Sequence, residues 1–265
     1  MSNTLAFSTL GCPEWNLDQI LTAAGEYGYT GIELRGYLDE MELPKAQPFT
    51  LPHRGATKQR FADAGIAVCC VSSSGTVAKE NFDHLESHVE LARDLDCPVV
   101  RIFGGSLPDN LPTADALQHA AETLRRFGDI AQENGVVLVL ETHDSFSTGA
   151  QVADLMDIAQ HPAVFSLWDF HHPYRQGEAM DETWRYLSPS LRYVHVKDGK
   201  DGTYTLLGEG DVPVFPMLKR VLDGGYTGPI SVEWEKRWKP NIPAPEIALP
   251  QYAEKLRTFL SEYRA

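Results

Sequence analysis

Four apolar runs that each end in an acidic residue or a histidine constrain the fold of this chain more than any other feature. They span residues 136–141, 164–169, 191–195 and 229–233. Each run has the length and composition of a strand that is buried on both faces until it leaves its sheet. The final residues are Glu141, Asp169, His195 and Glu233, and 26 to 38 residues separate each from the next. A strand and a helix with their loops take about thirty residues or more, so each run predicts one repeat of a parallel sheet.

Eight such strand–helix units are predicted along the chain. The other four expected strands are residues 5–9, 31–35, 66–71 and 99–103, and the expected helices end near residues 27, 64, 95, 133, 160, 187, 222 and 263. Asn16 or Asp18 is the expected N-cap of the first helix, and Thr113 that of the fourth. Residues 197–212 predict a long polar loop. The prolines between residues 240 and 250 predict a stiff connection before a closing helix at 251–263.

Alternation of strands and helices is compatible with an open doubly wound sheet or with a closed barrel. The 265 residues match the roughly 250 that an eightfold barrel needs. Closure also brings consecutive strand ends around one opening, whereas in an open sheet they would lie in a row, further from one another. The sequence therefore predicts an α/β fold, a (β/α)8 TIM barrel that forms a single domain over residues 1–265.

Composition excludes several classes of partner. The formal net charge of −14 repels phosphate backbones, so no nucleic acid is expected. No run of about eighteen apolar residues predicts a membrane span, and the N-terminus lacks the pattern of a secretory signal. The four cysteines, Cys12, Cys69, Cys70 and Cys97, have no CxxC spacing and are expected to be small buried residues in a reducing compartment. A cytoplasmic protein is the expectation.

Three carboxylates and one imidazole at neighbouring strand ends form a hard donor set for a divalent ion. A lone acid at a strand end is usually a loop cap or an ion-pair partner, but four on consecutive strands favour a metal site. Such an ion leaves coordination positions for the hydroxyl and carbonyl oxygens of a sugar, and it stabilises negative charge on them. Glu141 and Glu233 come from strands on opposite sides of the mouth. This placement suits one acid–base group on each face of a substrate.

Several other residues have less certain roles. Glu33 and Arg35 are expected to form a salt bridge within the mouth. Arg101 is expected to pair with a carboxylate or to contact a substrate phosphate or carboxylate. Among the aromatic residues near strand ends (Phe7, Trp15, Trp168 and Trp234), Trp15 is the favoured pocket wall. The histidines at 84, 88, 119 and 161 are expected at the surface.

The quartet lies in two motifs, Trp168-Asp-Phe-His-His172 and Val194-His-Val-Lys-Asp198. Together with residues 7–13, 31–35 and 100–105, these resemble the sugar phosphate isomerase/epimerase superfamily, the xylose-isomerase-like TIM barrels. The resemblance implies a divalent metal ion (Mn, Mg, Co or Zn) held by Glu141, Asp169, His195 and Glu233. It also implies proton exchange by Glu141 and Glu233, a substrate contact at His172, and a basic side chain after the seventh strand at Lys197.

One residue departs from the pattern of that superfamily. His143 stands where many relatives have asparagine, and a substrate contact, an extra ligand and a loop residue remain equal interpretations. The DNA-lesion endonucleases of the same superfamily use additional histidines, but the strong negative charge of this chain argues against them.

The expected function is that of a divalent-metal-dependent isomerase or epimerase of a small sugar, keto-sugar or polyol derivative. Proton transfer through a cis-enediolate would be carried out by the paired glutamates. One alternative is a metal-dependent dehydratase or hydroxy-keto-acid isomerase, and another is a non-catalytic sugar-binding barrel. The expected partner is a small sugar-like molecule, without nucleic acid or membrane, and a homo-oligomer is left open.

Overall fold

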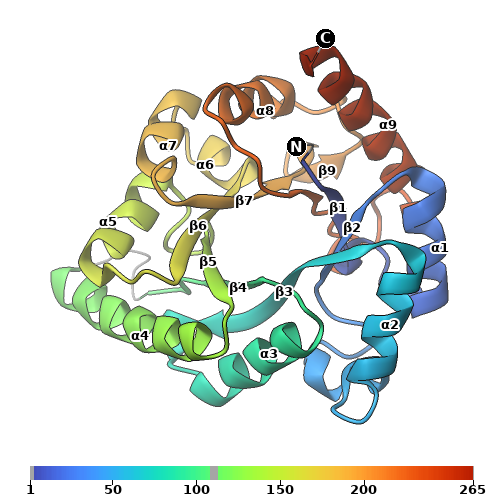
Figure 1. Ribbon diagram of the computed structural model, residues 1–265. Coiled ribbons are helices and arrows are strands. Elements are labelled where there is room, and N and C mark those ends of the chain that lie inside the picture. Colours follow the sequence, from blue (N-terminus) through green and yellow to red (C-terminus); the bar gives the residue numbers. More distant parts are fainter. Residues whose placement is uncertain (1–2, 108–112, 265) are drawn as a thin grey trace.

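Eight parallel strands close into a barrel, and helices surround it, as the view along the barrel in Figure 1 shows. The structure is a computed structural model that describes residues 3–107 and 113–264. Around the barrel the strand order is β1-β10-β7-β6-β5-β4-β3-β2. Closure is made by β1, in which Ala6 is paired with Ser231 of β10 on one side and with Gly31 of β2 on the other. The predicted (β/α)8 architecture is confirmed.

The barrel strands are β1 (Leu5–Ser8), β2 (Gly31–Leu34), β3 (Ala67–Thr76), β4 (Val99–Phe103), β5 (Val137–Glu141), β6 (Val164–Asp169), β7 (Leu191–Val196) and β10 (Ile230–Val232). A separate antiparallel hairpin is formed by β8 (Asp198–Lys200) and β9 (Thr203–Thr205). The helices are α1 (Leu17–Tyr27), α2 (Arg54–Ala64), α3 (Phe82–Asp94), α4 (Ala114–Glu133), α5 (Gly149–Ala159), α6 (His171–Arg175), α7 (Met180–Leu187), α8 (Val214–Asp223) and α9 (Pro245–Arg264). Short 3₁₀ turns lie at Thr9–Gly11, Leu43–Lys45, Gln47–Phe49 and Val77–Lys79.

Local sequence explains where several helices begin. Asn16 caps α1 in a reciprocal capping box with Gln19, and the Thr113 side chain accepts the N–H of Ala116 at the start of α4. Both predicted N-caps are thus confirmed, with Asn16 rather than Asp18 as the cap of α1. None of the helices within residues 3–107 and 113–264 is long and apolar enough to cross a membrane.

The structure differs from the sequence predictions at four segments. Strand β3 continues to Thr76, past the predicted end at 71, because Ser72 still pairs with Arg101 and Thr76 with Phe103 of β4. The short helix α6 was not predicted. Helix α9 begins at Pro245 instead of residue 251, since proline fits a first helical turn, and Pro250 lies inside the helix.

The fourth difference is the segment 197–212, which contains the β8–β9 hairpin instead of an unstructured loop. The carboxylate of Asp198 organises it, because its two oxygens accept the backbone N–H groups of Gly199, Gly208, Gly210 and Val212 at 2.8 to 3.3 Å. These hydrogen bonds hold residues 208–212 next to Asp198, which follows the end of β7.

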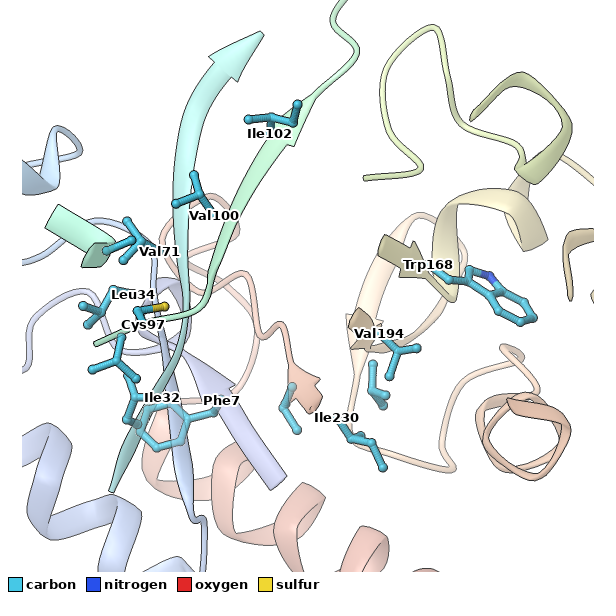
Figure 2. Packing of buried hydrophobic residues seen from close by; sticks show 14 of the residues in the cluster. Phe7, Ile32, Leu34, Val71, Cys97, Val100, Ile102, Trp168, Val194 and Ile230 are labelled. Atoms are coloured by element: carbon cyan, nitrogen blue, oxygen red, sulfur yellow. The ribbon is translucent and has the colours of Figure 1, made fainter. Parts of the chain in front are cut away.

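Two hydrophobic clusters flank the strands. The larger cluster fills the space between the strands and the helices, and Figure 2 shows part of it, with Ile32 and Leu34 on β2, Val71 on β3, and Val100 and Ile102 on β4. The smaller cluster consists of Ala6, Cys69, Cys70, Val99, Val139, Leu167 and Tyr193, with Val137 and Phe165 packed against it. All four cysteines are free and buried, as predicted. In β2 the outer positions Ile32 and Leu34 alternate with the inward position Glu33, and Arg35 follows directly after the strand.

Candidate metal centre

The four predicted ligands converge at the carboxyl end of the barrel. Glu141 and Asp169 are the last residues of β5 and β6, His195 lies in β7, and Glu233 follows β10. All four are buried, and one ligand atom from each lies within 4.8 Å of those of the others. Four side chains from consecutive positions in the strand order thus meet at one point, at the barrel face where TIM-barrel active sites lie.

The imidazole of His195 is oriented by carboxylates on both of its nitrogen atoms. Its Nδ1 faces Glu141 Oε1 at 3.3 Å and Glu233 Oε2 at 3.5 Å, while its Nε2 donates to Glu33 Oε2 at 2.9 Å. This arrangement leaves Nδ1 as the nitrogen that faces the other three candidate ligands. A carboxylate behind a histidine is the usual device that fixes the tautomer of a metal-binding imidazole.

Glu33 does not form the predicted salt bridge with Arg35. Instead its carboxylate accepts hydrogen bonds from His195, from Ser72 Oγ at 2.7 Å and from Ser231 Oγ at 2.9 Å. The prediction was wrong because the Glu33 carboxylate points across the barrel interior and is taken up by donors on β7, β3 and β10. Burial opposes ionisation of Glu33, yet His195 and the hydrogen bonds lower its pKa to about 2.

Lys197 lies against the same carboxylates. Its Nζ is 2.7 Å from Asp169 Oδ2, 2.5 Å from Glu233 Oε2 and 2.7 Å from Glu235 Oε1. Burial opposes the charged ammonium, but the three carboxylates outweigh it and raise the pKa of Lys197 well above its usual range. Glu235, which the sequence reasoning missed, also accepts the hydroxyl of Tyr204 at 2.7 Å.

The carboxylates gathered around this point outnumber the basic side chains. Five carboxylates gather there, and three basic side chains accompany them; the carboxylates are Glu33, Glu141, Asp169, Glu233 and Glu235, and the bases are Arg35, Arg101 and Lys197. Two negative charges remain when His195 is neutral, which is the charge that a divalent ion would compensate. Burial raises the pKa of Glu233 to about 7, which is the response of a carboxylate that lacks such compensation.

The donor set also fits a divalent ion. Glu141 Oε2 is buried and accepts no hydrogen bond from the described residues, although Arg101 Nε lies 3.3 Å away, and the buried Asp169 Oδ2 lies 2.7 Å from the ammonium group of Lys197. Carboxylate oxygens and one imidazole nitrogen are ligands that Zn²⁺, Mn²⁺, Co²⁺ and Mg²⁺ accept in differing proportions. The residues therefore fit the predicted cofactor without selecting one metal.

A series of rings lines the mouth beside β5 and β6. His143 packs against Phe103 and His172 with ring centroids 4.7 and 4.5 Å apart, and His171 packs against Tyr204 at 5.3 Å. Asp144 and Glu141 raise the pKa of His143 against the effect of burial, whereas burial lowers that of His172 to about 4. His143 and His172 thus lie at the mouth, where they were expected.

Trp15 has a different environment from the other expected substrate contacts. It packs in the outer hydrophobic cluster, and its indole N–H donates to Glu246 Oε1 at 3.2 Å. Phe7, Trp168 and Trp234 are fully buried in the same cluster. Within the described residues, no hydrogen bond or ring contact joins Trp15 to the four candidate ligands.

The expectation that four histidines lie at the surface was correct for His119 but wrong for His88, which is fully buried. His88 shares the inner face of α3 with Leu85, Val89 and Ala92, and its Nδ1 donates to the carbonyl of His84. The side chains of His84 and His161 are 12% and 10% exposed, so they too are mostly covered.

Glu42, His84 and His88 form a second cluster whose ligand atoms lie within 4.8 Å of one another. The backbone N–H of Ser74 donates to Nε2 of His84 at 2.9 Å, so this nitrogen is unprotonated and Nδ1 carries the hydrogen that faces Glu42 at 2.8 Å. An ion on Nδ1 would require the proton on Nε2, directly opposite the N–H of Ser74. In this tautomer His84 offers no free nitrogen to an ion, whereas Nε2 of His88 has no partner among the described residues.

Comparison with known proteins places the chain in a family. The family model for the xylose isomerase-like TIM barrel matches residues 21–262, so the chain belongs to that family.

Individual relatives include enzymes with named activities. The chain is 23% identical to fructoselysine 3-epimerase of Shigella flexneri over 96% of this chain and 97% of the relative. It is 23% identical to inosose dehydratase of Geobacillus kaustophilus over 83% of this chain and 80% of the relative. Among solved structures, L-ribulose 3-epimerase has a TM-score of 0.82 at 19% identity and covers 99% of this chain and 96% of its own. The IolI protein with a bound zinc atom has a TM-score of 0.79 at 16% identity, and the match covers 98% of this chain and 99% of that chain.

Proposed function

We propose that this chain is a divalent-metal-dependent isomerase or epimerase of a small sugar, keto-sugar or polyol derivative. The observation that carries the proposal is the convergence of Glu141, Asp169, His195 and Glu233 at the carboxyl end of the barrel. These four residues would hold the ion, which supplies stabilisation of the negative charge that develops on two adjacent substrate oxygens.

The chain itself would move the proton. Glu233 and Glu141 both lie beside Nδ1 of His195, at 3.5 and 3.3 Å, and their strands are separated by β6 and β7. One carboxylate would remove the proton next to the substrate carbonyl, and the other would return it to the opposite face of the cis-enediolate. General acid–base catalysis of this kind contributes about 10²- to 10⁴-fold to the rate.

Two further side chains would orient the substrate, and a third would position Glu233. His143 and His172 would contact hydroxyl groups at the β5–β6 side of the mouth. Lys197 would hold Glu233 in place through its ammonium group, 2.5 Å from Oε2. The buried position of Lys197 makes this a fixed contact, because its remaining partners, Asp169 and Glu235, also restrain it.

A dehydratase is the second candidate. The inosose dehydratase relatives support it, and so do the protonated groups of Lys197 and Tyr204 next to Glu233 and Glu235, which could pass a proton to a departing hydroxyl. Both candidates begin with removal of a proton next to a carbonyl, and they differ in whether a hydroxyl group is then lost.

Metal analysis followed by isotope exchange tests the proposal. The protein is purified without chelator, its metal content is measured by mass spectrometry, and the metal-loaded protein is incubated in D₂O with a panel of ketoses and cyclic polyol ketones. Deuterium on the carbon next to the carbonyl, with the product retaining every hydroxyl group, is the expected result. Loss of a hydroxyl would instead indicate the dehydratase.

Matched glutamate variants assign the roles. Glu233→Gln and Glu141→Gln preserve side-chain size but remove the base, so exchange should fall by at least about 10²-fold. Glu182→Gln, on the exposed face of α7, is the control and should leave exchange unchanged. Metal binding without exchange on any member of the panel would contradict both enzyme proposals and indicate a sugar-binding barrel.

A further inference from the structure

The mouth of the barrel has two chemically different halves. The neighbouring strands β5, β6, β7 and β10 deliver the four candidate metal ligands. The opposite half is formed by β1, β2, β3 and β4, and two buried arginines lie there: Arg101 in β4, and Arg35 directly after β2. A substrate that reaches across the mouth from the ligand quartet would therefore meet two guanidinium groups.

Arg35 is a buried arginine whose guanidinium has no direct hydrogen-bond partner in the described part of the chain. Its residue is 8% exposed, Nη1 is fully enclosed, and the guanidinium makes no hydrogen bond or ion pair with any residue in 3–107 or 113–264. Burial and the nearby Arg101 lower the pKa of Arg35 to about 9, although Glu233, Glu141 and Glu33 oppose this shift. These carboxylates stabilise the charge, but an enclosed N–H group without an acceptor is costly, so its retention needs an explanation outside the packing of the chain.

Arg101 is only partly compensated. It is 1% exposed, and Nε lies 3.3 Å from Glu141 Oε2 without hydrogen-bond geometry, while Nη1 is enclosed and has no partner among the described residues. Glu141 would also be engaged by the metal ion, so little of its charge remains for Arg101. The guanidinium is held in one orientation because it stacks on the ring of Phe103, with its carbon 3.7 Å from the ring centroid.

Glu33, Glu233 and Glu235 are already engaged by other groups, whereas Glu141 Oε2 accepts no hydrogen bond from the described residues. Glu33 accepts three hydrogen bonds, and Lys197 is bound to both Glu233 and Glu235. Two guanidinium groups that repel each other thus lie at the mouth, Arg101 beside Glu141 of the quartet and Arg35 directly after β2, and each has an enclosed N–H group without an acceptor. Arginine forks of this kind match the planar oxygen pairs of a carboxylate or phosphate.

We propose that Arg35 and Arg101 form an anion subsite that binds a carboxylate or phosphate group of the substrate. The substrate class is then a sugar acid, keto acid or sugar phosphate rather than a neutral ketose. The inference rests on the proposed function for the orientation of the reacting end, which lies at the quartet while the anionic end lies at the arginines. The subsite itself depends only on the two side chains.

Direct binding of simple anions is the first test. Acetate and inorganic phosphate are titrated by calorimetry into the metal-loaded wild-type chain, Arg35→Gln, Arg101→Gln and the control Arg60→Gln on the outer helix α2. Each arginine variant should weaken anion binding by about 10- to 100-fold, as expected for loss of a charge-assisted bidentate pair, and the control should not. Stronger binding of phosphate than acetate identifies a sugar phosphate, and the reverse identifies a sugar acid.

Substrate selectivity is the second test, and Arg35→Gln is the informative variant because Arg35 makes no contact with a candidate ligand. In the isotope-exchange assay, kcat/KM should fall about 10- to 100-fold for a keto-hexuronate or a ketose phosphate and change less than about twofold for the matching neutral ketose. Thermal melts establish that the variant is folded. If Arg35→Gln does not fold, Arg35→Lys keeps the charge, loses the fork, and should give the same selectivity change in smaller measure.

The outcomes separate this inference from the proposed function. Anion binding that is absent, or that survives both arginine substitutions in folded protein, overturns the subsite, and so does exchange that prefers neutral ketoses. Absence of exchange on every compound, with anion binding that still depends on Arg35, refutes the isomerase and leaves the subsite standing.

Discussion

Substitution of Glu33 tests whether the carboxylate behind His195 determines metal affinity. Glu33→Gln keeps the shape of the side chain, and its amide oxygen can still accept the Nε2–H of His195, but the hydrogen bond loses its charge. Hydrogen bonds to charged groups contribute about 1.5–3 kcal/mol and neutral ones about 0.5–1.5 kcal/mol. The difference, about 1–1.5 kcal/mol, corresponds to about a tenfold loss of metal affinity.

Glu33→Ala should have a larger effect. It also leaves the hydroxyls of Ser72 and Ser231 without the acceptor that they share, at 2.7 and 2.9 Å in the wild-type chain. A loss toward 100-fold is expected, the upper end of what removal of such outer carboxylates costs in known metal sites.

Protons compete with the metal ion in this measurement. Burial disfavours the charged imidazole, but Glu233, Glu33 and Glu141 raise the pKa of His195 well above its usual value, so metal affinity should increase as the pH rises and the proton leaves. A divalent ion carries twice the charge of a proton, so the loss of Glu33 weakens binding of the metal ion more than it weakens binding of the proton at His195.

Competition with a fluorescent zinc chelator at pH 6, 7 and 8 measures these affinities, and Glu182→Gln is again the control. Unchanged metal affinity in both Glu33 variants, with native melting curves, would refute the assignment of Glu33 as the group that orients His195.

Three further outcomes are expected from other parts of the molecule. Burial lowers the pKa of His88 to about 3, so between pH 6.5 and 3 the unfolded chain binds a proton that the folded chain does not. The contribution of His88 to the free energy of unfolding should therefore fall by about 2 kcal/mol between pH 7 and 5. Chemical denaturation at both pH values checks this, and His88→Leu should not show this part of the pH dependence. Asp198→Asn leaves one acceptor oxygen for four N–H groups. The free energy of local opening, measured by hydrogen exchange at Gly208 and Gly210, should therefore be lower by about 2–4 kcal/mol. Unchanged protection would contradict the role given to Asp198. Removal of the metal by a chelator should lower the melting temperature by about 5–10 °C when the ion was present at about 100 times its Kd, and Glu233→Gln should reduce that difference.

The repeat of the barrel and its four strand-end residues could be predicted because both are local properties. Strand β5, for example, is an apolar run of the right length, and Glu141 is simply the residue at which it ends. Nothing more than the order of the strands is needed to bring Glu141 near Asp169, since β5 and β6 are neighbours.

The partners across the barrel could not be predicted in this way. Glu33 meets His195 although 162 residues separate them, and which inward side chain of β2 reaches β7 depends on the tilt and stagger of the closed barrel. Glu33 carried the same signal as the other strand-end acids, namely its place near the end of an apolar run, and the nearby Arg35 suggested the wrong partner.

Glu235 and the β8–β9 hairpin were missed for a different reason. The hairpin is fixed by the bonds of Asp198 to distant glycines, and a polar, glycine-rich sequence gives no indication of which carboxylate will collect them. The buried position of His88, by contrast, could have been predicted from the sequence. Its helical spacing with Leu85 and Val89 places it on the inward face of α3.

Tyr252 connects the last helix to the reacting centre. Its hydroxyl accepts the backbone N–H of Asp198 at 2.8 Å and donates to the carbonyl of Thr205 at 2.9 Å, so a side chain of α9 fastens both strands of the hairpin. Lys197, the residue before Asp198, takes its position from that attachment. A helix on the outside of the cylinder, which contributes no candidate ligand, thereby sets where an ammonium group rests inside it.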